Sequence, residues 1–242
     1  GLAQWNSGKM HNAIPRDGKI VFAVPTDKKE EVKADWNVFA SQVEDEYHVT
    51  DTNMKWVLES CEAQSVMPEK VSANLINALQ AVDNGVFAMC QDKELAWMVE
   101  TSSNVASVQS EADKVVIVSS QRSNVTSNLT NVCNTVKATY ELAGADVEQT
   151  DGYPAWQPKH GSELQRIVKE AYRKLFGKDP VVRGIHAGLE CGLFSEKYPD
   201  LDMVSFGPTL RNVHTPDECL YIPTVQMVWD HLLEILKNIP KK

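Results

Sequence analysis

The chain has 242 residues, of which 43% are apolar, and its formal net charge is −9 at pH 7. This length and apolar fraction suffice to bury a sizeable core, as one large domain or two ordinary ones. The negative charge argues against a nucleic-acid or anionic-membrane surface, because both require a basic face. A small polar or zwitterionic partner fits this charge better.

The sequence also indicates a compartment. No stretch approaches the ~20 consecutive apolar residues that span a bilayer, and the N-terminus lacks the basic and apolar regions of a signal peptide. The five cysteines are odd in number, scattered and without a C-x-x-C pair, so they indicate neither a disulfide framework nor a zinc ribbon. We therefore expect a soluble cytoplasmic protein with reduced thiols.

The first part of the chain predicts a mixture of strands and helices. The spacing of apolar residues predicts a strand over 19–25, an amphipathic helix over 27–47, a second helix over 72–82, two strands over 99–108 and 114–118 joined by a polar turn, a third helix over 126–143 and a short strand beginning at Val147. Gly144 marks the end of the third helix. Together these elements predict an α+β unit with antiparallel hairpins and helices on one side.

A tract with two prolines and a glycine at 151–158 predicts a boundary. After it, Ser162 and Gln165 form a capping box that opens a helix, and Gly177 supplies its stop. The remaining pattern predicts a strand over 181–185, a short helix over 189–198, a strand over 201–206 and a closing helix over 225–239. A strand, a helix and a strand in so few residues predict a right-handed parallel crossover. The fold class is therefore α/β, with an α+β unit followed by a βαβ segment.

Ligands bind outside the carboxyl ends of the strands in an open parallel sheet. His186 follows the end of one predicted strand, and Gly207 and Pro208 follow the end of the next. His214 lies in a proline-bounded loop from which its imidazole could reach the same crevice. A neutral imidazole is a common zinc ligand, and Glu218 could hold its second nitrogen. Judged from these residues alone, a solvated loop histidine beside acids is the favoured interpretation.

Three glycines surround the start of the helix predicted over 189–198, namely Gly184, Gly188 and Gly192. The free N–H groups at this start can receive a carboxylate, although the glycines also allow the helix to pack closely on the sheet. Glu190, in the first turn, is favourably placed for the helix dipole in either case. Phosphate-binding loops and Ser, Cys or Thr nucleophile signatures are absent, so metal chemistry is the remaining specific option.

The segment IHAGLECGLFSEKYPDLDMVSFGPTLRNVHTPDE resembles the C-terminal block of bacterial aminoacyl-histidine dipeptidases, the Xaa-His or carnosinase-like branch of the di-zinc aminopeptidase and aminoacylase superfamily. The likeness continues through VETSSNVASV, DGYPAW and GKMHNAIPRD, so it spans nearly the entire chain. It implies a catalytic α/β domain into which a lid, also used for dimerisation, is inserted. Residues 1–154 would form most of that lid, and residues 155–242 the C-terminal segment of the zinc-peptidase catalytic domain.

The resemblance also implies roles for particular residues. The family's last metal ligand falls on His214. Asn12 matches a lid asparagine that helps to hold the substrate, and Arg122 matches the lid arginine that binds the substrate's terminal carboxylate. An arginine suits this task because its planar guanidinium can bond a carboxylate in two places. His186 and Glu190 match positions that line the pocket.

The resemblance implies a cytoplasmic, homodimeric metallo-dipeptidase that releases C-terminal histidine from dipeptides. Two divalent ions, zinc or alternatively manganese or cobalt, would activate a water molecule. The family's His-x-Asp motif, bridging aspartate, paired glutamates and remaining metal aspartate precede the lid and have no counterpart in this sequence. We therefore expect the general base to lie outside this chain and the chain alone to be inactive.

Two other interpretations stay open. The chain could be a non-catalytic module for dimerisation and substrate binding, or part of a related di-zinc tripeptidase or aminoacylase. The last group shares the metal site, so motifs alone do not separate it from the dipeptidases. A His-x-Asp segment encoded upstream of Gly1 would favour an enzyme over the non-catalytic module.

Overall fold

The structure is a computed structural model that describes residues 1–62, 64–91, 93, 95–150, 152, 154, 156, 161–184, 190–213 and 217–240. Contacts between Cα atoms divide the chain into two compact units. Unit 1 consists of residues 1–84, 104–120 and 135–147, and unit 2 of residues 85–103, 121–134 and 148–242.

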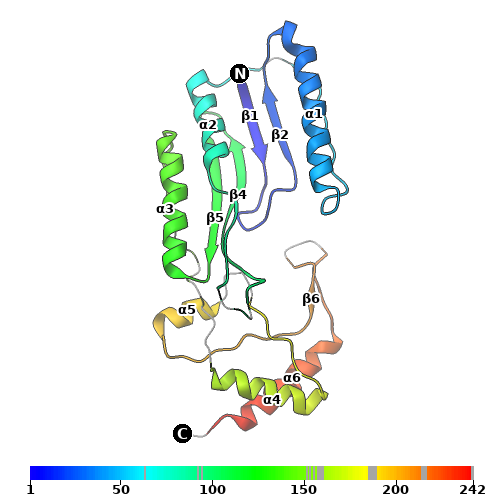
Figure 1. The fold of residues 1–242 in the computed structure, drawn as a ribbon, viewed down its shortest axis with the longest axis vertical. Coiled ribbons are helices and arrows are strands. Elements are labelled where there is room, and N and C mark those ends of the chain that lie inside the picture. The colour runs from blue at the N-terminus through cyan, green and yellow to red at the C-terminus, as the bar shows by residue number, and fades with distance from the viewer. Residues whose placement is uncertain are drawn as a thin grey trace. The chain divides into compact units, whose positions relative to one another are not determined.

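Helices and strands alternate irregularly along the chain (Figure 1). In order they are β1 (Leu2–Ser7), β2 (Gly18–Phe22), the 3-10 turn η1 (Thr26–Lys28), α1 (Lys29–Tyr47), α2 (Glu69–Ala81), β3 (Gly85–Met89), β4 (Val99–Ser110), β5 (Val115–Ser123), α3 (Thr126–Leu142), α4 (Glu163–Phe176), α5 (Glu190–Lys197), β6 (Leu210–Arg211), β7 (Cys219–Leu220) and α6 (Pro223–Asn238). One sheet has the order β2-β1-β4-β3, and β5 also pairs with β4. The described β1/β2, β1/β4 and β3/β4 pairings are antiparallel, and β6 and β7 form a separate ladder. The fold class is α/β, as predicted.

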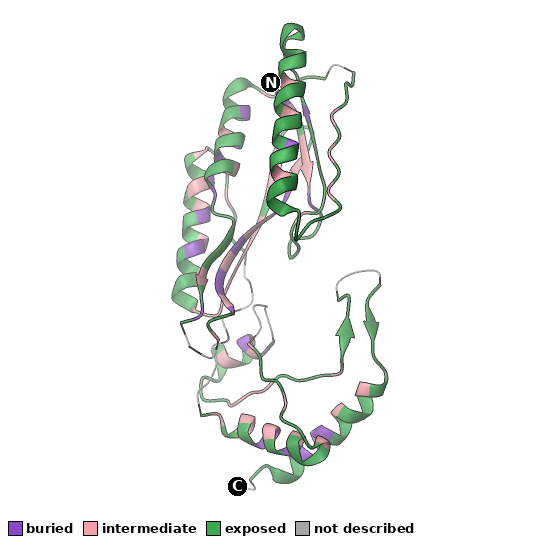
Figure 2. Cartoon of the chain, turned by 45° about the vertical axis from the view of Figure 1, so that its right-hand side comes forward, coloured by how far each residue is buried: buried purple, intermediate pink, exposed green. Residues whose placement is uncertain are grey.

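In unit 1, α2 and the second half of α3, residues 135–142, bury apolar side chains. Leu75 and Ala78 of α2 are buried, as is Tyr140 of α3 (Figure 2). The Tyr140 hydroxyl lies 2.9 Å from Ser119 Oγ on β5, so α3 contacts the sheet through a hydrogen bond as well as through apolar surface. The predicted helices over 27–47, 72–82 and 126–143 are confirmed within a few residues at each end.

In unit 2 the helices α4 and α6 share a small apolar core. It consists of Ile167, Val168, Ala171 and Ile235. His231 of α6 is buried against this core, and its Nε2 lies 2.9 Å from the carbonyl oxygen of Val168. The α4 helix begins and ends as predicted, because Ser162 Oγ accepts a hydrogen bond from Gln165 N and Gly177 adopts a left-handed φ of 67°.

Three predicted strands are wrong in the part of the chain that the structure describes. The backbone at Val147, 181–184 and 201–206 pairs with no described strand, and Ile185 lies outside the described residues. A strand exists only where a neighbouring strand pairs its N–H and C=O groups. Val181 is instead 77% exposed, so its apolar side chain is not buried as predicted. The predicted parallel crossover therefore does not form among the described residues.

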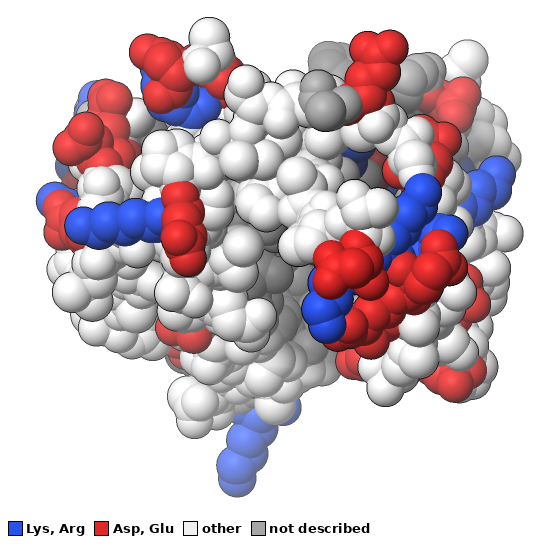
Figure 3. Space-filling model, turned by 90° about the horizontal axis from the view of Figure 1, so that it is seen from above, with Lys and Arg blue, Asp and Glu red and all other residues white. Residues whose placement is uncertain are grey.

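Many of the described ion pairs join exposed side chains of one helix, although Lys174 of α4 pairs with Glu234 of α6. Lys33 contacts Glu30 at 2.7 Å on α1, and Arg166 contacts Glu163 and Glu170 at 2.6 and 2.7 Å on α4. Figure 3 shows such acidic and basic side chains beside one another on the face that it draws. Exposed pairs contribute at most about 1 kcal/mol each, so they do not determine the fold. Among the described helices, none has the length and apolar character needed to cross a membrane.

Candidate active site

Asn12 lies in the loop that joins β1 to β2, in unit 1. The loop is linked to β4 one residue further on, because Asn104 Nδ2 donates a hydrogen bond to the carbonyl oxygen of Ala13 at 2.9 Å. Ala13 N also donates to the carbonyl oxygen of Met10 at 3.3 Å, which forms a turn around Asn12. The side chain of Asn12 is exposed on this anchored turn, where it is able to contact a ligand.

The base of the same loop is fixed by Gly8. Its φ of 65° is in the left-handed region, and an added Cβ would overlap the carbonyl oxygen of Ala106 on β4. Gln109 Nε2 donates to the carbonyl oxygens of Ser7 and Gly8 at 3.1 and 2.8 Å. Glycine is therefore required here both by the backbone conformation and by the close approach of β4.

Arg122 is the next-to-last residue of β5, in unit 2, and its side chain is half-buried. Its neighbour Ser123 faces the start of α3, since Ser123 Oγ accepts a hydrogen bond from Val125 N at 3.0 Å. Successive side chains of a strand point to opposite faces of the sheet. The guanidinium of Arg122 therefore leaves the strand on the face opposite to the α3 N-terminus.

The junction between β5 and α3 is held by β4. The carbonyl oxygen of Glu100 accepts a hydrogen bond from Asn124 N at 3.1 Å, and Glu100 Oε1 accepts one from Asn128 Nδ2 at 2.5 Å. Sequence reasoning did not select Glu100. The signal that could have found it is a carboxylate inside an otherwise uncharged stretch predicted to be a strand.

Glu190 is the first residue of α5 and is exposed. Gly192, in the first turn of this helix, is buried against Pro154, and an added Cβ would overlap the Pro154 carbonyl oxygen. At Gly184 an added Cβ would meet the thioether of Met98. Gly184 and Gly192 are therefore closely packed, although their neighbours Met98 and Pro154 lie outside the strands and not in a sheet, against which the packing was predicted.

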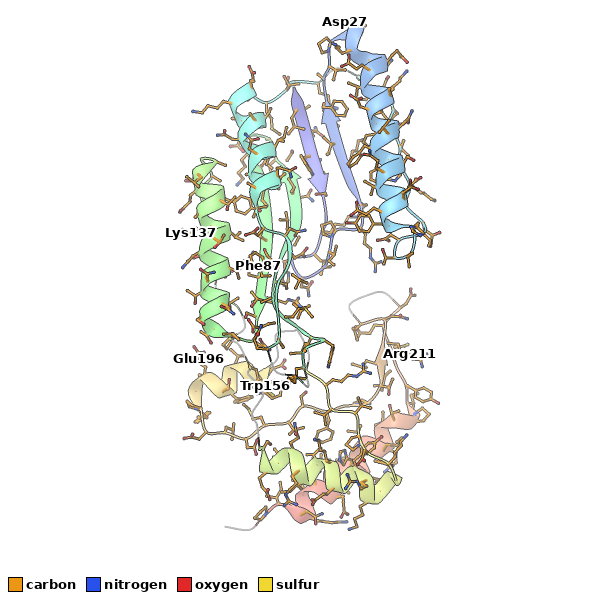
Figure 4. The ribbon with its side chains drawn as sticks, in the orientation of Figure 1. Asp27, Phe87, Lys137, Trp156, Glu196 and Arg211 are labelled. Atoms are coloured by element: carbon orange, nitrogen blue, oxygen red, sulfur yellow. The ribbon has the colours of Figure 1, made fainter. Side chains whose placement is uncertain are left out.

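His186, Gly188 and His214 lie outside the described residues. The segment that includes His214 is bounded by the β6/β7 ladder, in which Arg211 pairs with Cys219. Figure 4 labels Arg211 on β6. Asn212, with a φ of 52°, donates from Nδ2 to the carbonyl oxygen of Asp217 at 3.4 Å.

The described residues do not fit a metal ion by themselves. In the ranges that the structure describes, His, Cys, Asp and Glu side chains form no group of three that could hold one. Catalytic zinc usually takes three protein ligands. Asn12 belongs to unit 1, and Arg122 and Glu190 belong to unit 2, so the structure assigns the described candidates to separate units.

Comparisons with known proteins agree on one family. Over 243 residues the chain is 37% identical to the cytosol non-specific dipeptidase of Escherichia coli (strain K12), and the match covers 100% of this chain and 50% of that relative. The crystal structure of aminoacylhistidine dipeptidase from Vibrio alginolyticus matches with a TM-score of 0.84 at 36% identity, covering 100% of this chain and 49% of that one. The chain thus spans about half the length of these relatives.

A family profile gives the same result. The profile of peptidase family M20/M25/M40 matches residues 17–238, which is most of the chain. The resemblance to dipeptidases of the metallopeptidase class is therefore confirmed at the level of the family. The chain belongs to peptidase family M20/M25/M40.

Proposed function

We propose that this chain is part of a longer metallo-dipeptidase, the parent enzyme, which hydrolyses Xaa-His dipeptides. The observation that carries the proposal is the match of the whole chain to about half of two proteins named as dipeptidases. Residues 1–154 belong to the lid and dimerisation domain in this proposal, and residues 155–242 to the C-terminal segment of the catalytic domain. The 242-residue chain alone is inactive.

Substrate recognition is the task of four residues in this proposal. Arg122 binds the terminal carboxylate of the dipeptide, and its half-buried position at the end of a fixed strand supports this role, because a preorganised guanidinium loses little freedom on binding. Asn12 contacts the substrate from its anchored loop. Glu190, the first residue of α5, and His186 line the substrate pocket in this proposal.

The metal centre requires residues beyond those that the structure describes. His214 is the one ligand that we assign to this chain, and the other ligands and the general base come from the remainder of the parent enzyme. Two divalent ions, zinc or alternatively manganese or cobalt, would activate the attacking water when bound. No described carboxylate of this chain takes part in that step.

The parent enzyme is proposed to be a cytoplasmic homodimer that pairs through the lid. The name of the E. coli relative places that protein in the cytosol, which supports the compartment. Strand β2 lies at the end of the described sheet order, and an edge strand offers unpaired N–H and C=O groups to a second copy. We therefore assign self-association to the lid.

A broader dipeptidase is the second candidate, because the E. coli relative is named non-specific. The two candidates differ in how strongly the rate of hydrolysis depends on the C-terminal residue of the dipeptide. Hydrolysis of glycyl-histidine and glycyl-leucine by the parent enzyme separates them. A kcat/KM at least ~10-fold higher for glycyl-histidine supports the Xaa-His assignment, and equal values support the broader one.

The role of Arg122 is tested in the same assay. Arg122→Ala should raise KM while kcat changes less, because a carboxylate contact is made in the ground state as well as in the transition state. Absence of dipeptide hydrolysis by the wild-type parent enzyme with zinc, manganese or cobalt would refute the proposed function. An unchanged KM in the Arg122→Ala variant would refute the role of Arg122 alone.

A further inference from the structure

Two successive polar residues of β4 are buried on the same side. In a regular strand, successive side chains point to opposite faces. Glu100 is 7% exposed and Thr101 is 2% exposed. In the β3/β4 ladder Ala88 pairs with Thr101 and Met89 pairs with Val99, so Glu100 is an extra residue without a partner in β3. Such a β-bulge redirects the side chain of the extra residue. The bulge explains why Glu100 and Thr101 turn toward the same buried side.

A compensating irregularity lies on the neighbouring strand. Val86 pairs with Ser102 and Ala88 pairs with Thr101, so Phe87 of β3 is the extra residue there. Phe87 is labelled in Figure 4 and is 41% exposed. The ladder thus recovers its register on both sides of Thr101, while Glu100 remains directed at α3.

The Glu100 carboxylate terminates a directed chain of hydrogen bonds. An ionised carboxylate only accepts, so Thr101 Oγ1, at 3.2 Å, must donate to Glu100 Oε1. The 2.8 Å bond between Thr101 Oγ1 and Ser123 Oγ then has Ser123 as its donor. Ser123 Oγ is left to accept from Val125 N, at 3.0 Å. One charge therefore orients two hydroxyl groups and a backbone N–H at the α3 N-terminus.

A second set of bonds links Glu100 to the same helix end. Asn128 Nδ2, in the first turn of α3, donates to Glu100 Oε1, and Asn124 N donates to the Glu100 carbonyl oxygen. A carboxylate beside a helix N-terminus is also stabilised by the helix dipole. Burying a carboxylate is costly unless it is bonded in this way, and an apolar residue would fill the space at lower cost. The carboxylate therefore serves a purpose beyond packing.

Arg122 lies directly before the residues that both sets of bonds hold. It precedes Ser123, which the hydroxyl chain holds, and Asn124, which the Glu100 carbonyl holds. We infer that Glu100 is a positioning residue, which fixes the β5–α3 junction so that the Arg122 guanidinium meets the substrate carboxylate. This inference rests on the proposed function, because it assigns Glu100 a role through the substrate contact of Arg122.

The test uses variants of the parent enzyme with glycyl-histidine as substrate. Glu100→Ala and Asn128→Ala should raise KM by ~3–10-fold with kcat within about twofold, because a displaced guanidinium weakens ground-state binding. Glu100→Gln should stay within about threefold of wild type, since a single amide oxygen can accept from both donors. Thr130→Ala is the matched control. It removes an exposed hydroxyl that donates to the Thr126 carbonyl on the same helix, and its KM should not change.

Two further measurements separate positioning from simple stabilisation. Asn128→Ala combined with Arg122→Ala should raise KM no more than Arg122→Ala alone, because both changes remove the same contact. Hydrogen exchange at the Asn124 and Val125 amides should accelerate in Asn128→Ala, which shows that the junction has loosened. Asn128 is exposed, so this variant should fold even if Glu100→Ala does not.

Each contrary result has a distinct meaning. If Arg122→Ala raises KM and Asn128→Ala does not, the inference is wrong and the proposed function stands. Additive effects in the double variant, or a Glu100→Gln variant as impaired as Glu100→Ala, would equally overturn the positioning role. If Arg122→Ala itself leaves KM unchanged, the proposed role of Arg122 is wrong, and the inference about Glu100 is lost with it.

Discussion

Ser162 donates a hydrogen bond from its hydroxyl to Asp202 Oδ1 at 2.6 Å and so links the N-terminus of α4 to a residue forty positions later. Asp202 Oδ2 accepts from Leu164 N at 3.0 Å, while Ser162 Oγ accepts from Gln165 N at 2.9 Å. Two N–H groups in the first turn of α4 are therefore bonded by two different side chains. The Ser162 N-cap of the predicted capping box is one half of a larger cap.

Replacing Asp202 should destabilise the protein by removing part of the N-terminal cap of α4. Asp202→Ala should lower the free energy of unfolding by roughly 1 kcal/mol, which is typical of a lost N-cap. Urea denaturation followed by circular dichroism measures the change, and the exposed Asp146→Ala is the control. Ser162→Ala combined with Asp202→Ala should cost less than the sum of the single changes, because the two side chains share one bond. Additive costs would contradict a single cap.

Gly8 should be among the positions least tolerant of a side chain. Gly8→Ala should cost roughly 3 kcal/mol or more, because the left-handed backbone and the overlap with the Ala106 carbonyl act together. Gly177→Ala is the matched comparison, since its φ is also left-handed but its added Cβ meets nothing within 4 Å. It should cost roughly 1 kcal/mol. Equal losses in urea denaturation would show that the approach of β4 is unimportant.

The helix α4 could be predicted because its signals lie within the helix itself. The three wrong strands could not, because a strand depends on pairing with a distant segment. The caps of α4 lie within its own residues, and its helical spacing is intrinsic to the segment. The stretches at 181–184 and 201–206 carry apolar residues suited to strands, but a strand also needs a partner that the segment itself does not specify. The apolar pattern of these stretches therefore did not suffice to predict their structure.

The residues of the candidate site were likewise only partly predictable from the local sequence. Arg122 and Asn12 were named through a family resemblance, because their own neighbourhoods carry no motif with a known chemistry. The β-bulge at Glu100 depends on the register between β3 and β4, which no local periodicity encodes. The strand β1 was missed because its residues alternate poorly, although β2 and β4 both pair with it. Pairing across the sheet, rather than local sequence, sets these features.

The ion pair between Lys174 and Glu234 should make stability depend on pH. Lys174 Nζ donates to Glu234 Oε1 at 2.5 Å, and this hydrogen bond, followed by one from Asn238, holds the pKa of Glu234 below its ordinary value of 4.5. A carboxyl with a lowered pKa stabilises the fold above its unfolded-state pKa, and that contribution is lost as the pH falls through the folded-state value. Lys174→Met should therefore destabilise the protein more at pH 7 than at acidic pH, where Glu234 becomes protonated.

A second lysine on an exposed helix provides the control for this pH dependence. The side chain of Glu234 is 9% exposed, whereas that of Glu30, which pairs with Lys33, is 80% exposed. Salt screens exposed pairs more strongly than buried ones. Lys33→Met should accordingly change the free energy of unfolding less than Lys174→Met at pH 7 and about 0.15 M salt. A difference between wild type and Lys174→Met that does not shrink as the pH is lowered from 7 would show that packing, not charge, is lost.

The close approach of α5 to Pro154 should matter for the substrate pocket. Gly192→Ala should displace the start of α5, and with it Glu190, because the added Cβ would overlap the backbone of Pro154. At Gly177, which ends α4, an added Cβ meets nothing within 4 Å, so Gly177→Ala is the control. In the parent enzyme Gly192→Ala should raise KM for glycyl-histidine by at least ~3-fold, and Gly177→Ala should not. Equal KM values would place Glu190 outside the pocket.

The chain alone should bind no metal tightly through His214. A catalytic zinc ion usually takes about three protein ligands, and the described residues contribute no group of three His, Cys, Asp or Glu side chains. A single imidazole leaves the ion largely hydrated, so little affinity is gained and the bound water is not activated near neutral pH. Titration calorimetry of the 242-residue chain with zinc should therefore give the same weak isotherm as His214→Ala.

Release of histidine from glycyl-histidine tests whether the metal site of this chain is incomplete. The 242-residue chain incubated with zinc, manganese or cobalt and glycyl-histidine should release no free histidine above the metal-only blank, whereas the parent enzyme should release it and His214→Ala in the parent should not. The reason is ligand count, because losing one ligand from a site that must hold its ion in an open but fixed geometry removes the activated water. If the chain releases histidine and its His214→Ala variant does not, the chain carries a complete site. The assignment of the remaining ligands to the rest of the parent enzyme would then be wrong.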